Sequence, residues 1–592
     1  MVVREIMEQP KAEVTSKKLG GLRTMPFIIT NEALEKVASI GLQANMIFYL
    51  MYEYHLEVAT GASILFLWTS LSYLTPIIGA FLSDSWLGRF RVITLGTIIS
   101  LLGIVILWCT AIFPKARPVH CNMLSGEKCH SPKPAQLLLL LFSFVLMSIG
   151  SGGIKPCSMA FGADQMENPE NPKNASIMQI FFNWYYASVG LSVMIAVTVM
   201  VYIQDSAGWV VGFGVPAGVM LVSTISFLLG SSVYVKVSAN KKLSAGFLQV
   251  IAAAWKNRHL NLQPTNSDGW YILRGSKLVT PTNKLSYLNK ACMITNAEKD
   301  LSPDGLAKDP WSLCTVRQVE ELKALINVLP IWSTGIIIGV VMNQNSFPAV
   351  QAGTMERHIF PHMKLPAASF SIFGILTLTI WVVIYDRLLV PLISKYTKRP
   401  RGLTRKQRIG AGLVLSCFAT TVAAEVERHR RSTAIKEGFA NNEHGVVTMS
   451  ARWLVPQYCL SGLAEAFNVI GQIEFYYSQF PKSMASIAVA LFTLGFGLGS
   501  LLGSLIVTVM NDVTKKWGVS WVSSNLNQGH YDYYYLVLTV MSVVNFLYFL
   551  LCSWAYGSCE DKTIWDEGDY DEDMKGEEMH KSGEYQVDAS VA

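Results

Sequence analysis

The sequence predicts an all-α membrane protein in which twelve membrane-spanning helices form two groups of six. Hydrophobic residues make up 51% of the 592 residues and charged residues only 15%, whereas soluble domains carry about 25% charged residues. A helix needs ~20 apolar residues to cross a bilayer, and runs of that kind recur along the chain. We expect spans at 27–52, 61–83, 92–113, 135–160, 177–203, 209–235, 321–345, 366–390, 408–427, 451–479, 484–510 and 533–556.

A long polar stretch between the sixth and seventh spans divides the chain. The expected domains are an N-terminal segment at 1–26, a six-helix bundle at 27–235, a linker at 236–320, a second six-helix bundle at 321–556 and an acidic tail at 557–592. Two six-helix halves joined in this way are typical of transporters whose halves rock about a site near the middle of the membrane.

The distribution of basic residues sets the expected orientation. The loop at 395–408 is the most basic short loop of the chain, and Lys and Arg accumulate in cytoplasmic loops. With twelve spans, both termini and the linker then lie in the cytoplasm as well. Linker segment 243–257 has an amphipathic pattern that suits the membrane surface. The acidic tail either binds regulators of unknown kind or only increases solubility.

Several functional classes are not expected. The net charge of +6 belongs to the cytoplasmic loops of a membrane protein and does not indicate nucleic-acid binding. The ten cysteines have no metal-ligand spacing, and we find no nucleophile–base pair and no phosphate-binding glycine loop. We therefore expect no enzyme, no cofactor, no metal site and no ATP-driven transport. Cys121 and Cys129 share a loop on the expected outer side, where they form either a disulfide or two free thiols.

The first span carries three ionisable residues, Glu32, Glu35 and Lys36. A charge at membrane depth costs several kcal/mol and seldom lacks a function. Spacings of three and four residues place the three side chains along one helical face. We expect this face to line a protein interior or a wet cavity. The alternative is a shorter span that leaves the three residues among lipid headgroups.

The turn after the second span contains Asp84, Gly88 and Arg89. An Asp at a helix end and a nearby Arg can pair with the neighbouring helix and hold one gate closed. The pattern resembles the loop signature of the major facilitator superfamily, with one additional residue between Asp and Gly. The alternative is an ordinary solvated turn.

Two later spans also contain ionisable residues. Lys155 follows glycines that allow close helix approach and precedes Pro156, which can open backbone groups to a cavity. Glu474 lies in the tenth span, beside aromatic residues that include Tyr476. A pair between Lys155 and Glu474 would join the two halves in one conformation and break in the other. Glu465, in the same span as Glu474, is either functional or structural.

Together these motifs resemble the proton-dependent oligopeptide transporter family, and within it the plant nitrate and peptide transporter branch. The resemblance covers nearly the whole chain, and the details N-E-A-L-E-K-V-A-S, L-V-P-Q-Y and N-Q-G-H-Y-D-Y-Y-Y are most similar to its first subfamily. The shared motifs are E-A-L-E-K at 32–36, S-G-G-I-K-P-C at 151–157, F-G-A-D-Q at 161–165, F-F-N-W-Y-Y at 181–186, Y-L-N-K-A at 287–291, V-L-P-I-W-S-T-G at 328–335 and G-Q-I-E-F-Y at 471–476.

The resemblance implies a proton-coupled symporter of the plasma membrane. Glu32 and Glu35 would carry the coupling protons, and Lys36 would tune their proton affinities. Lys155 and Glu474 would form a salt bridge near the substrate, with Tyr476 in the same site. Linkage between protonation and substrate binding follows if the substrate changes the partner of either group.

The resemblance leaves the substrate open. Low-affinity nitrate import is the leading hypothesis, and peptides, plant hormones or other organic acids are alternatives within the same class. Met342 stands where some nitrate-carrying relatives place a histidine, and a methionine cannot donate a cationic hydrogen bond to nitrate. A nutrient sensor without net transport is a further alternative, which the intact proton-coupling motif disfavours.

Overall fold

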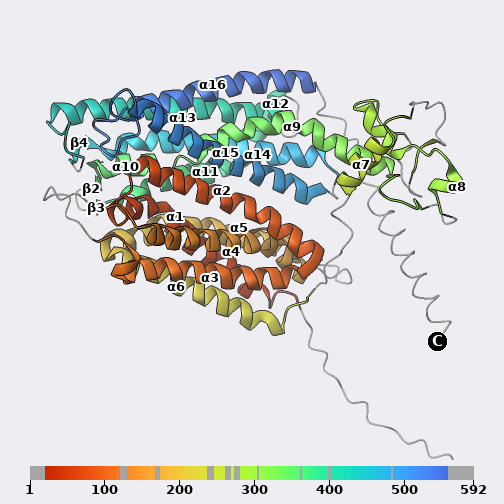
Figure 1. The fold of residues 1–592 in the computed structure, drawn as a ribbon, viewed down its shortest axis with the longest axis horizontal. Helices are drawn as coiled ribbons and strands as arrows, with labels where there is room; N and C mark the ends of the chain where they lie inside the picture. Colours follow the sequence, from red (N-terminus) through yellow and green to blue (C-terminus); the bar gives the residue numbers. More distant parts are fainter. Residues whose placement is uncertain are drawn as a thin grey trace, which may run out of the picture.

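The computed structural model describes residues 20–119, 130–166, 174–236, 246–260, 269–272, 280–302, 306–360, 363–397, 402–443, 445–481 and 484–557. The predictions for Cys121, for Cys129 and for the acidic tail beyond residue 557 lie outside these ranges. Long helices dominate the described chain and lie side by side in two bundles (Figure 1). The predicted all-α class is confirmed.

The N-terminal bundle follows the expected spans closely. Its helices are α1 (Met25–Tyr52), α2 (Val58–Leu82), α3 (Arg89–Ile112), α4 (Pro134–Met166), α5 (Asn174–Ile195) and α6 (Val201–Leu229), with π-helical turns η1 (Ser83–Leu87) and η4 (Ala196–Met200). Gly208 has a φ of 77° and interrupts α6. Because this left-handed conformation favours glycine, the fifth span ends there and the sixth begins.

The C-terminal bundle contains the remaining spans. They are α9 (Val316–Met342), α11 (Ile372–Ile384) continued by η9 (Tyr385–Leu389) and α12 (Val390–Thr397), α13 (Arg405–Lys436), α14 (Val455–Gln479), α15 (Ala485–Lys515) and α16 (Tyr531–Tyr556). Thr315 and Gln318 form a capping box at the start of α9, and Thr404 and Gln407 form one at the start of α13. These boxes satisfy backbone N–H groups that a helix start leaves unpaired.

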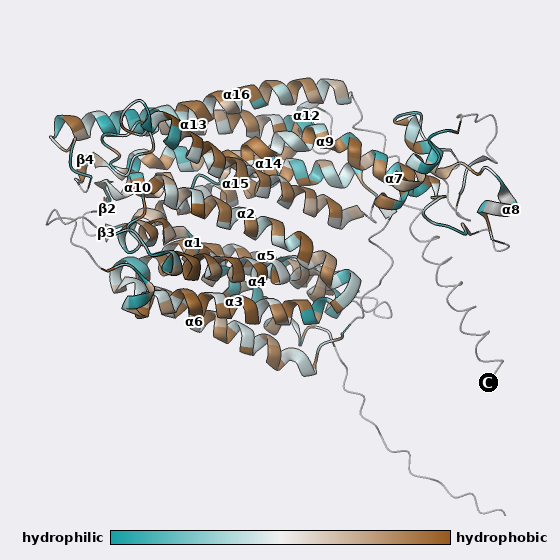
Figure 2. Cartoon of the chain, viewed as in Figure 1, coloured by the Kyte–Doolittle hydropathy of each residue, from teal (hydrophilic) through white to brown (hydrophobic). Residues whose placement is uncertain are grey.

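Length and composition identify nine helical segments within the described ranges as candidate membrane spans. The segment at 176–232 contains two spans, separated at Gly208. Helices α1 and α14 are not among the nine. Helix α1 carries Glu32, Glu35 and Lys36, and α14 carries Glu465 and Glu474. Figure 2 shows apolar residues along both bundles and polar residues gathered toward their ends and over the linker.

Glycines allow α2, α3 and α4 to pack closely. A Cβ on Gly79 of α2 would lie 2.0 Å from the Gly152 carbonyl oxygen of α4, and one on Gly150 would lie 2.4 Å from the Ser100 nitrogen of α3. Such distances leave no room for a side chain. The predicted role of the glycines around Lys155 in helix packing is confirmed.

The described part of the linker packs at the start of α9 (Figure 1). Helix α7 (Gly246–Lys256) buries Val250 and Ala253 against η7 (Ser286–Cys292) and α9. Lys323 of α9 donates a hydrogen bond of 2.7 Å to the Thr282 carbonyl oxygen, and the Thr282 nitrogen donates one of 2.9 Å to Glu320. These bonds fasten the linker to the C-terminal bundle.

The two bundles meet at the opposite end of the molecule. There the Ser504 hydroxyl of α15 donates a 3.2 Å hydrogen bond to the Ser63 carbonyl oxygen of α2, and Lys515 pairs with Glu57 at 3.3 Å. The main apolar core continues from one bundle into the other at this end. Short elements complete the closure: η8 (Ala367–Ser371), η10 (Ala451–Leu454), α10 (Ser346–Gly353), β1 (Met355–Glu356) parallel to β4 (Val447–Ser450), and β2 (His358–Phe360) antiparallel to β3 (Met363–Lys364).

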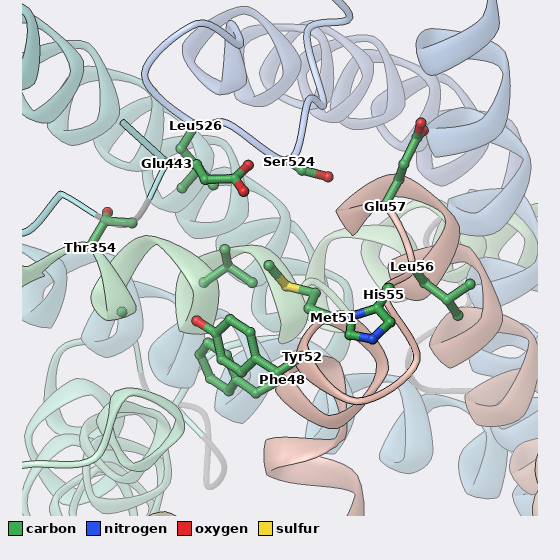
Figure 3. Close-up of a pocket in the computed structure, with 12 residues that line it drawn as sticks. Phe48, Met51, Tyr52, His55, Leu56, Glu57, Thr354, Glu443, Ser524 and Leu526 are labelled. Carbon is green, nitrogen blue, oxygen red and sulfur yellow. The ribbon is translucent and has the colours of Figure 1, made fainter. Parts of the chain in front are cut away.

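A cavity of about 450 Å³ lies within this closed end. Figure 3 shows Phe48 and Tyr52 of α1 on one side of it and Thr354 and Glu443 of the C-terminal half on another. None of the functional residues singled out from the sequence lines it.

Candidate functional site

A second cavity, of about 270 Å³, lies between the two bundles. Its walls come from helices α1, α2 and the α5–η4 region of the N-terminal half and from α9, α11, α14 and α15 of the C-terminal half. The lining residues are Ile40, Gln43, Ala44, Leu65, Phe66, Thr69, Tyr73, Val193, Val197, Met342, Asn343, Asn345, Ser346, Ala368, Ser371, Gly374, Ile375, Tyr458, Ser461, Gly462, Glu465 and Phe496. A cavity shared by two halves changes shape when the halves move.

Glu465 is the acidic residue in the lining of this cavity. Its side chain is exposed to the cavity, although protein atoms surround the carboxyl group. Tyr73 of the other half lines the same cavity within electrostatic range of Glu465. The structure therefore places Glu465 in the wall of this cavity, and whether its role is functional or structural stays a prediction.

The rest of the polar lining is uncharged. The Gln43 amide of α1 donates a 2.7 Å hydrogen bond to the Thr69 hydroxyl of α2, which fixes both side chains in the wall. Met342, at the end of α9, lines the cavity as the sequence led us to expect for a substrate-site residue. Its thioether adds a flexible apolar surface in place of a hydrogen-bond donor.

Glu32 and Lys36 lie on a stripe of α1, at spacings of four residues, that continues to Ile40 and Ala44 in the cavity wall. Lys36 is about one turn and Glu32 about two turns from Ile40, whereas Glu35 lies beside this stripe and not on it. Lys36 Nζ lies 3.4 Å from Glu32 Oε1, and the Glu32 side chain is only 2% exposed. Glu35 is fully buried, and neither carboxyl oxygen has a hydrogen-bond partner among the described residues. The expectation that these residues face a protein interior fits this burial, and their depth in the membrane stays a prediction.

Lys155 of α4 adds a second cation to this group. It lies within electrostatic range of Lys36, Glu35 and Glu32. Two carboxyl groups and two ammonium groups therefore share one region beside the cavity. When both carboxyl groups are ionised, their charges balance those of the lysines.

Glu474 lies apart from Lys155 in this structure. Its carboxylate accepts a 2.6 Å hydrogen bond from Arg408, near the start of α13. The expected pair between the halves is therefore replaced by a pair within the C-terminal half. Glu474 lies nine residues beyond Glu465 along α14, a distance of ~14 Å, and it does not line the cavity.

Tyr476 also lies outside the cavity. Its side chain is fully buried in the C-terminal bundle, and its hydroxyl donates a 3.0 Å hydrogen bond to Gln472 Oε1. The expectation that Tyr476 contacts substrate has no support in this conformation. The physical reason is helical geometry, because Glu465 and Tyr476 are eleven residues apart on α14 and differ in depth by ~16 Å.

The predicted gating residues form a clamp inside the N-terminal half. Arg89 donates hydrogen bonds of 2.7 Å to both carboxylate oxygens of Asp164 on α4 and lies 3.3 Å from Asp84. Gly88 has a φ of 79°, which a residue with a side chain rarely adopts. The pairing with a neighbouring helix therefore exists, whereas its role in gating stays a prediction.

Comparison with known proteins places the chain in a family. A model of the POT family matches residues 90–526. Protein NRT1/PTR FAMILY 1.2 of Arabidopsis thaliana is 49% identical over 572 residues, which cover 94% of this chain and 94% of the relative. The chain belongs to the POT family. This transporter also matches Arabidopsis Protein NRT1/PTR FAMILY 1.1, with 49% identity over 563 residues, 94% of this chain and 95% of the relative. The predicted plant branch and its first subfamily are confirmed.

Solved structures show the fold. An auto-inhibited POT family peptide transporter superposes with a TM-score of 0.67 at 20% identity, covering 91% of this chain and 98% of that one. A POT family transporter in complex with 5-aminolevulinic acid gives a TM-score of 0.58 at 16% identity, with coverage of 90% and 97%. The predicted major facilitator fold of twelve helices in two halves is confirmed, and the protein is a multi-pass membrane transporter.

Proposed function

We propose that this transporter is a proton-coupled symporter that imports a small anionic solute across the plasma membrane by alternating access. Low-affinity nitrate is the first substrate to test. The observation that carries the proposal is the position of Glu32 and Lys36 on the stripe of α1 that continues to Ile40 and Ala44 in the cavity wall, with the buried Glu35 beside it. Proton-binding groups and a substrate-sized cavity then lie on one helix, about one to two turns from each other at Ile40.

Electrostatics links the proton to the anion. Glu35 is buried without a hydrogen-bond partner in the described residues, and proton binding removes a charge that burial disfavours. Once the carboxyl groups of Glu32 and Glu35 are neutral, the charges of Lys36 and Lys155 are no longer balanced. The site then favours an anion, so proton and anion bind together.

The closed end of the molecule fits one stage of such a cycle. Hydrogen bonds between Ser63 and Ser504 and the Glu57–Lys515 pair join the halves at the end expected to face outward. Release of a solute toward the linker end would follow in this conformation, and uptake would need these contacts to open. The Arg408–Glu474 pair belongs to this conformation, and a pair between Glu474 and Lys155 would belong to another.

Glu465 favours a second candidate substrate. An ionised carboxylate in the cavity repels a bare anion but attracts an ammonium group. A peptide or another zwitterion would therefore find a partner in Glu465, whereas nitrate, a plant hormone or another organic acid would require Glu465 to be protonated. An anionic substrate therefore requires a protonated Glu465, whereas a zwitterion is favoured by an ionised Glu465.

Uptake measurements in oocytes that express the protein test the proposal. Labelled nitrate uptake and inward current should rise as the external pH falls from 7.5 to 5.5, values chosen to span about a hundredfold change in proton concentration. Water-injected oocytes give the background. Binding without uptake would favour the sensor alternative, and an absence of pH-dependent uptake for nitrate, peptides and organic acids alike would refute the symporter.

The Glu465→Gln variant separates the two substrate classes in the same assay. For an anion, removing the carboxylate should preserve uptake at low pH and increase it at neutral pH. For a zwitterion, the same change should lower uptake by tenfold or more, because an ammonium group loses its charged partner. Glu425→Gln is the control, because Glu425 lies in an exposed ion pair on α13.

A further inference from the structure

A side pocket opens next to the central cavity, inside the C-terminal half. It has a volume of about 70 Å³ and lies between helices α9, α13, α14 and α16. Met342, Asn345, Tyr458 and Ser461 line both the side pocket and the central cavity. The two spaces therefore have these four residues in common, one of which carries a flexible thioether.

Two buried polar groups in the side pocket lack partners. The Tyr535 hydroxyl and Gln457 Oε1 have no hydrogen-bond partner among the described residues, although their side chains are only 3% and 4% exposed. Both residues line the pocket. An unpaired buried polar group costs free energy comparable to that of a lost hydrogen bond, so each of the two groups favours a ligand that can bond to it.

Two neighbouring polar residues in the same wall, Gln344 and Thr420, are already hydrogen-bonded. Gln344 Oε1 accepts a 3.0 Å hydrogen bond from the Tyr534 hydroxyl, and its amide donates one of 3.0 Å to the Val340 carbonyl oxygen. The Thr420 hydroxyl donates to the Ser416 carbonyl oxygen at 3.1 Å. Among the solvent-shielded polar atoms of this wall, the Tyr535 hydroxyl and Gln457 Oε1 are the ones without a partner in the described residues.

The two free groups differ in what they can bind. A tyrosine hydroxyl can donate or accept, whereas the oxygen of a glutamine amide only accepts. A hydroxyl or a primary carboxamide supplies both a donor and an acceptor and satisfies both groups. Nitrate offers acceptors alone and leaves Gln457 Oε1 unpaired. The volume of the side pocket is about that of two water molecules. One small terminal group of a substrate therefore fits in it.

We propose that the side pocket is a specificity subsite that binds a hydroxyl or carboxamide group of an organic substrate whose charged end occupies the central cavity. Substrates that lack such a group bind in the central cavity alone. The flexible Met342 forms part of the wall that this group must pass. The proposal rests on the proposed function, since it names a substrate class for the same transport site.

A matched ligand series tests the subsite by binding, without requiring transport. Butyrate, 4-hydroxybutyrate and succinamate share a carboxylate and a chain length and differ in ending in a methyl, a hydroxyl or a carboxamide group. Binding to the purified full-length transporter is measured from the ligand-induced rise in Tm at increasing ligand concentration. We expect succinamate and 4-hydroxybutyrate to bind about tenfold more tightly than butyrate, a ratio typical of one to two buried hydrogen bonds.

Two conservative variants assign that preference to the pocket. Tyr535→Phe removes only an unpaired hydroxyl, and Gln457→Met removes the amide at similar volume, so both variants should fold. Each should reduce the preference to about twofold while leaving butyrate affinity unchanged. Tyr533→Phe is the matched control, because Tyr533 lies on the same helix with a largely exposed side chain.

Equal affinities across the series in the unmodified protein would overturn the proposal and indicate a pocket that holds water alone. A preference that survives in both variants would also overturn it and place the recognition elsewhere. These outcomes are distinct from failure of the proposed function, which is an absence of pH-dependent uptake in oocytes whatever the Tm measurements show.

Discussion

Glu35 and Glu465 show how the same side chain gains different roles from its surroundings. Glu35 is fully buried beside Lys36, whereas Glu465 is exposed to a cavity that two halves of the protein share. In the proposed function, Glu35 is one of the residues that carry the coupling protons. Exposure to the cavity suits Glu465 to contact with a substrate or its counter-ion.

The sequence predicted the first of these residues better than the second. Glu32, Glu35 and Lys36 stood out because three charged residues within one apolar run allow few interpretations other than a functional group. Glu465 follows Tyr458 and Ser461 at spacings of seven and four residues, a polar stripe on one face that the same helical rule could have revealed. The partner of Glu474 could not be predicted, because Arg408 lies on a different helix and the pairing depends on conformation.

The Glu35→Gln variant tests whether Glu35 carries a coupling proton. A glutamine side chain has the same size as a glutamate side chain, but its amide cannot take up and release a proton as a carboxyl group does. We expect solute accumulation against its gradient to fall to the passive level, whereas exchange of internal for external solute should continue. The measurement is labelled-solute uptake and counterflow in proteoliposomes under an imposed pH gradient. Glu425→Gln serves as the control, and proton-driven accumulation by Glu35→Gln at the unmodified rate would remove Glu35 from the coupling mechanism.

Helices were predicted more reliably than the contacts between them. Apolar runs located every span, and boundaries differed by a few residues where caps such as Thr404 extend a helix beyond its apolar core. Helix α13 is the largest exception. It continues to Lys436 because Arg430 and Glu427 form a fully buried ion pair at 2.7 Å. The sequence shows only a charged segment there, since the partners that enclose this pair come from distant parts of the chain.

The close packing between α2 and α4 predicts that a side chain at Gly79 destabilises the protein. In a Gly79→Ala variant the new Cβ would lie 2.0 Å from a backbone oxygen of α4, so the two helices must move apart. We expect the stability of the purified protein to fall by about 1–3 kcal/mol, a usual range for overpacking, with a lower Tm in detergent. The control is Gly218→Ala on α6, where a Cβ meets no atom within 4 Å. Equal Tm values for the two variants would contradict the close packing.

The whole molecule joins two stable bundles through contacts of unequal strength. Glycine-mediated helix packing holds each half together, whereas polar contacts such as Ser63–Ser504 and the exposed Glu57–Lys515 pair join the halves at one end. Exposed ion pairs contribute ~0–1 kcal/mol, so this pair alone opposes separation only weakly. Separation of the bundles at this end must also divide the apolar core that they share there, and rocking of two halves about a central site involves such a separation.

Crosslinking across the closed end tests whether this motion is needed. The Ser63 and Thr508 hydroxyl oxygens of α2 and α15 lie 3.2 Å apart, which places the two residues close enough for a disulfide after replacement by cysteine. We expect oxidation of a Ser63→Cys/Thr508→Cys double variant to abolish uptake and a reductant to restore it, while each single variant transports normally under both conditions. The inhibition follows because a covalent bond keeps the outer end closed and the cavity cannot receive solute from that side. Full uptake by a protein shown to be crosslinked on a gel would mean that the halves do not separate between α2 and α15.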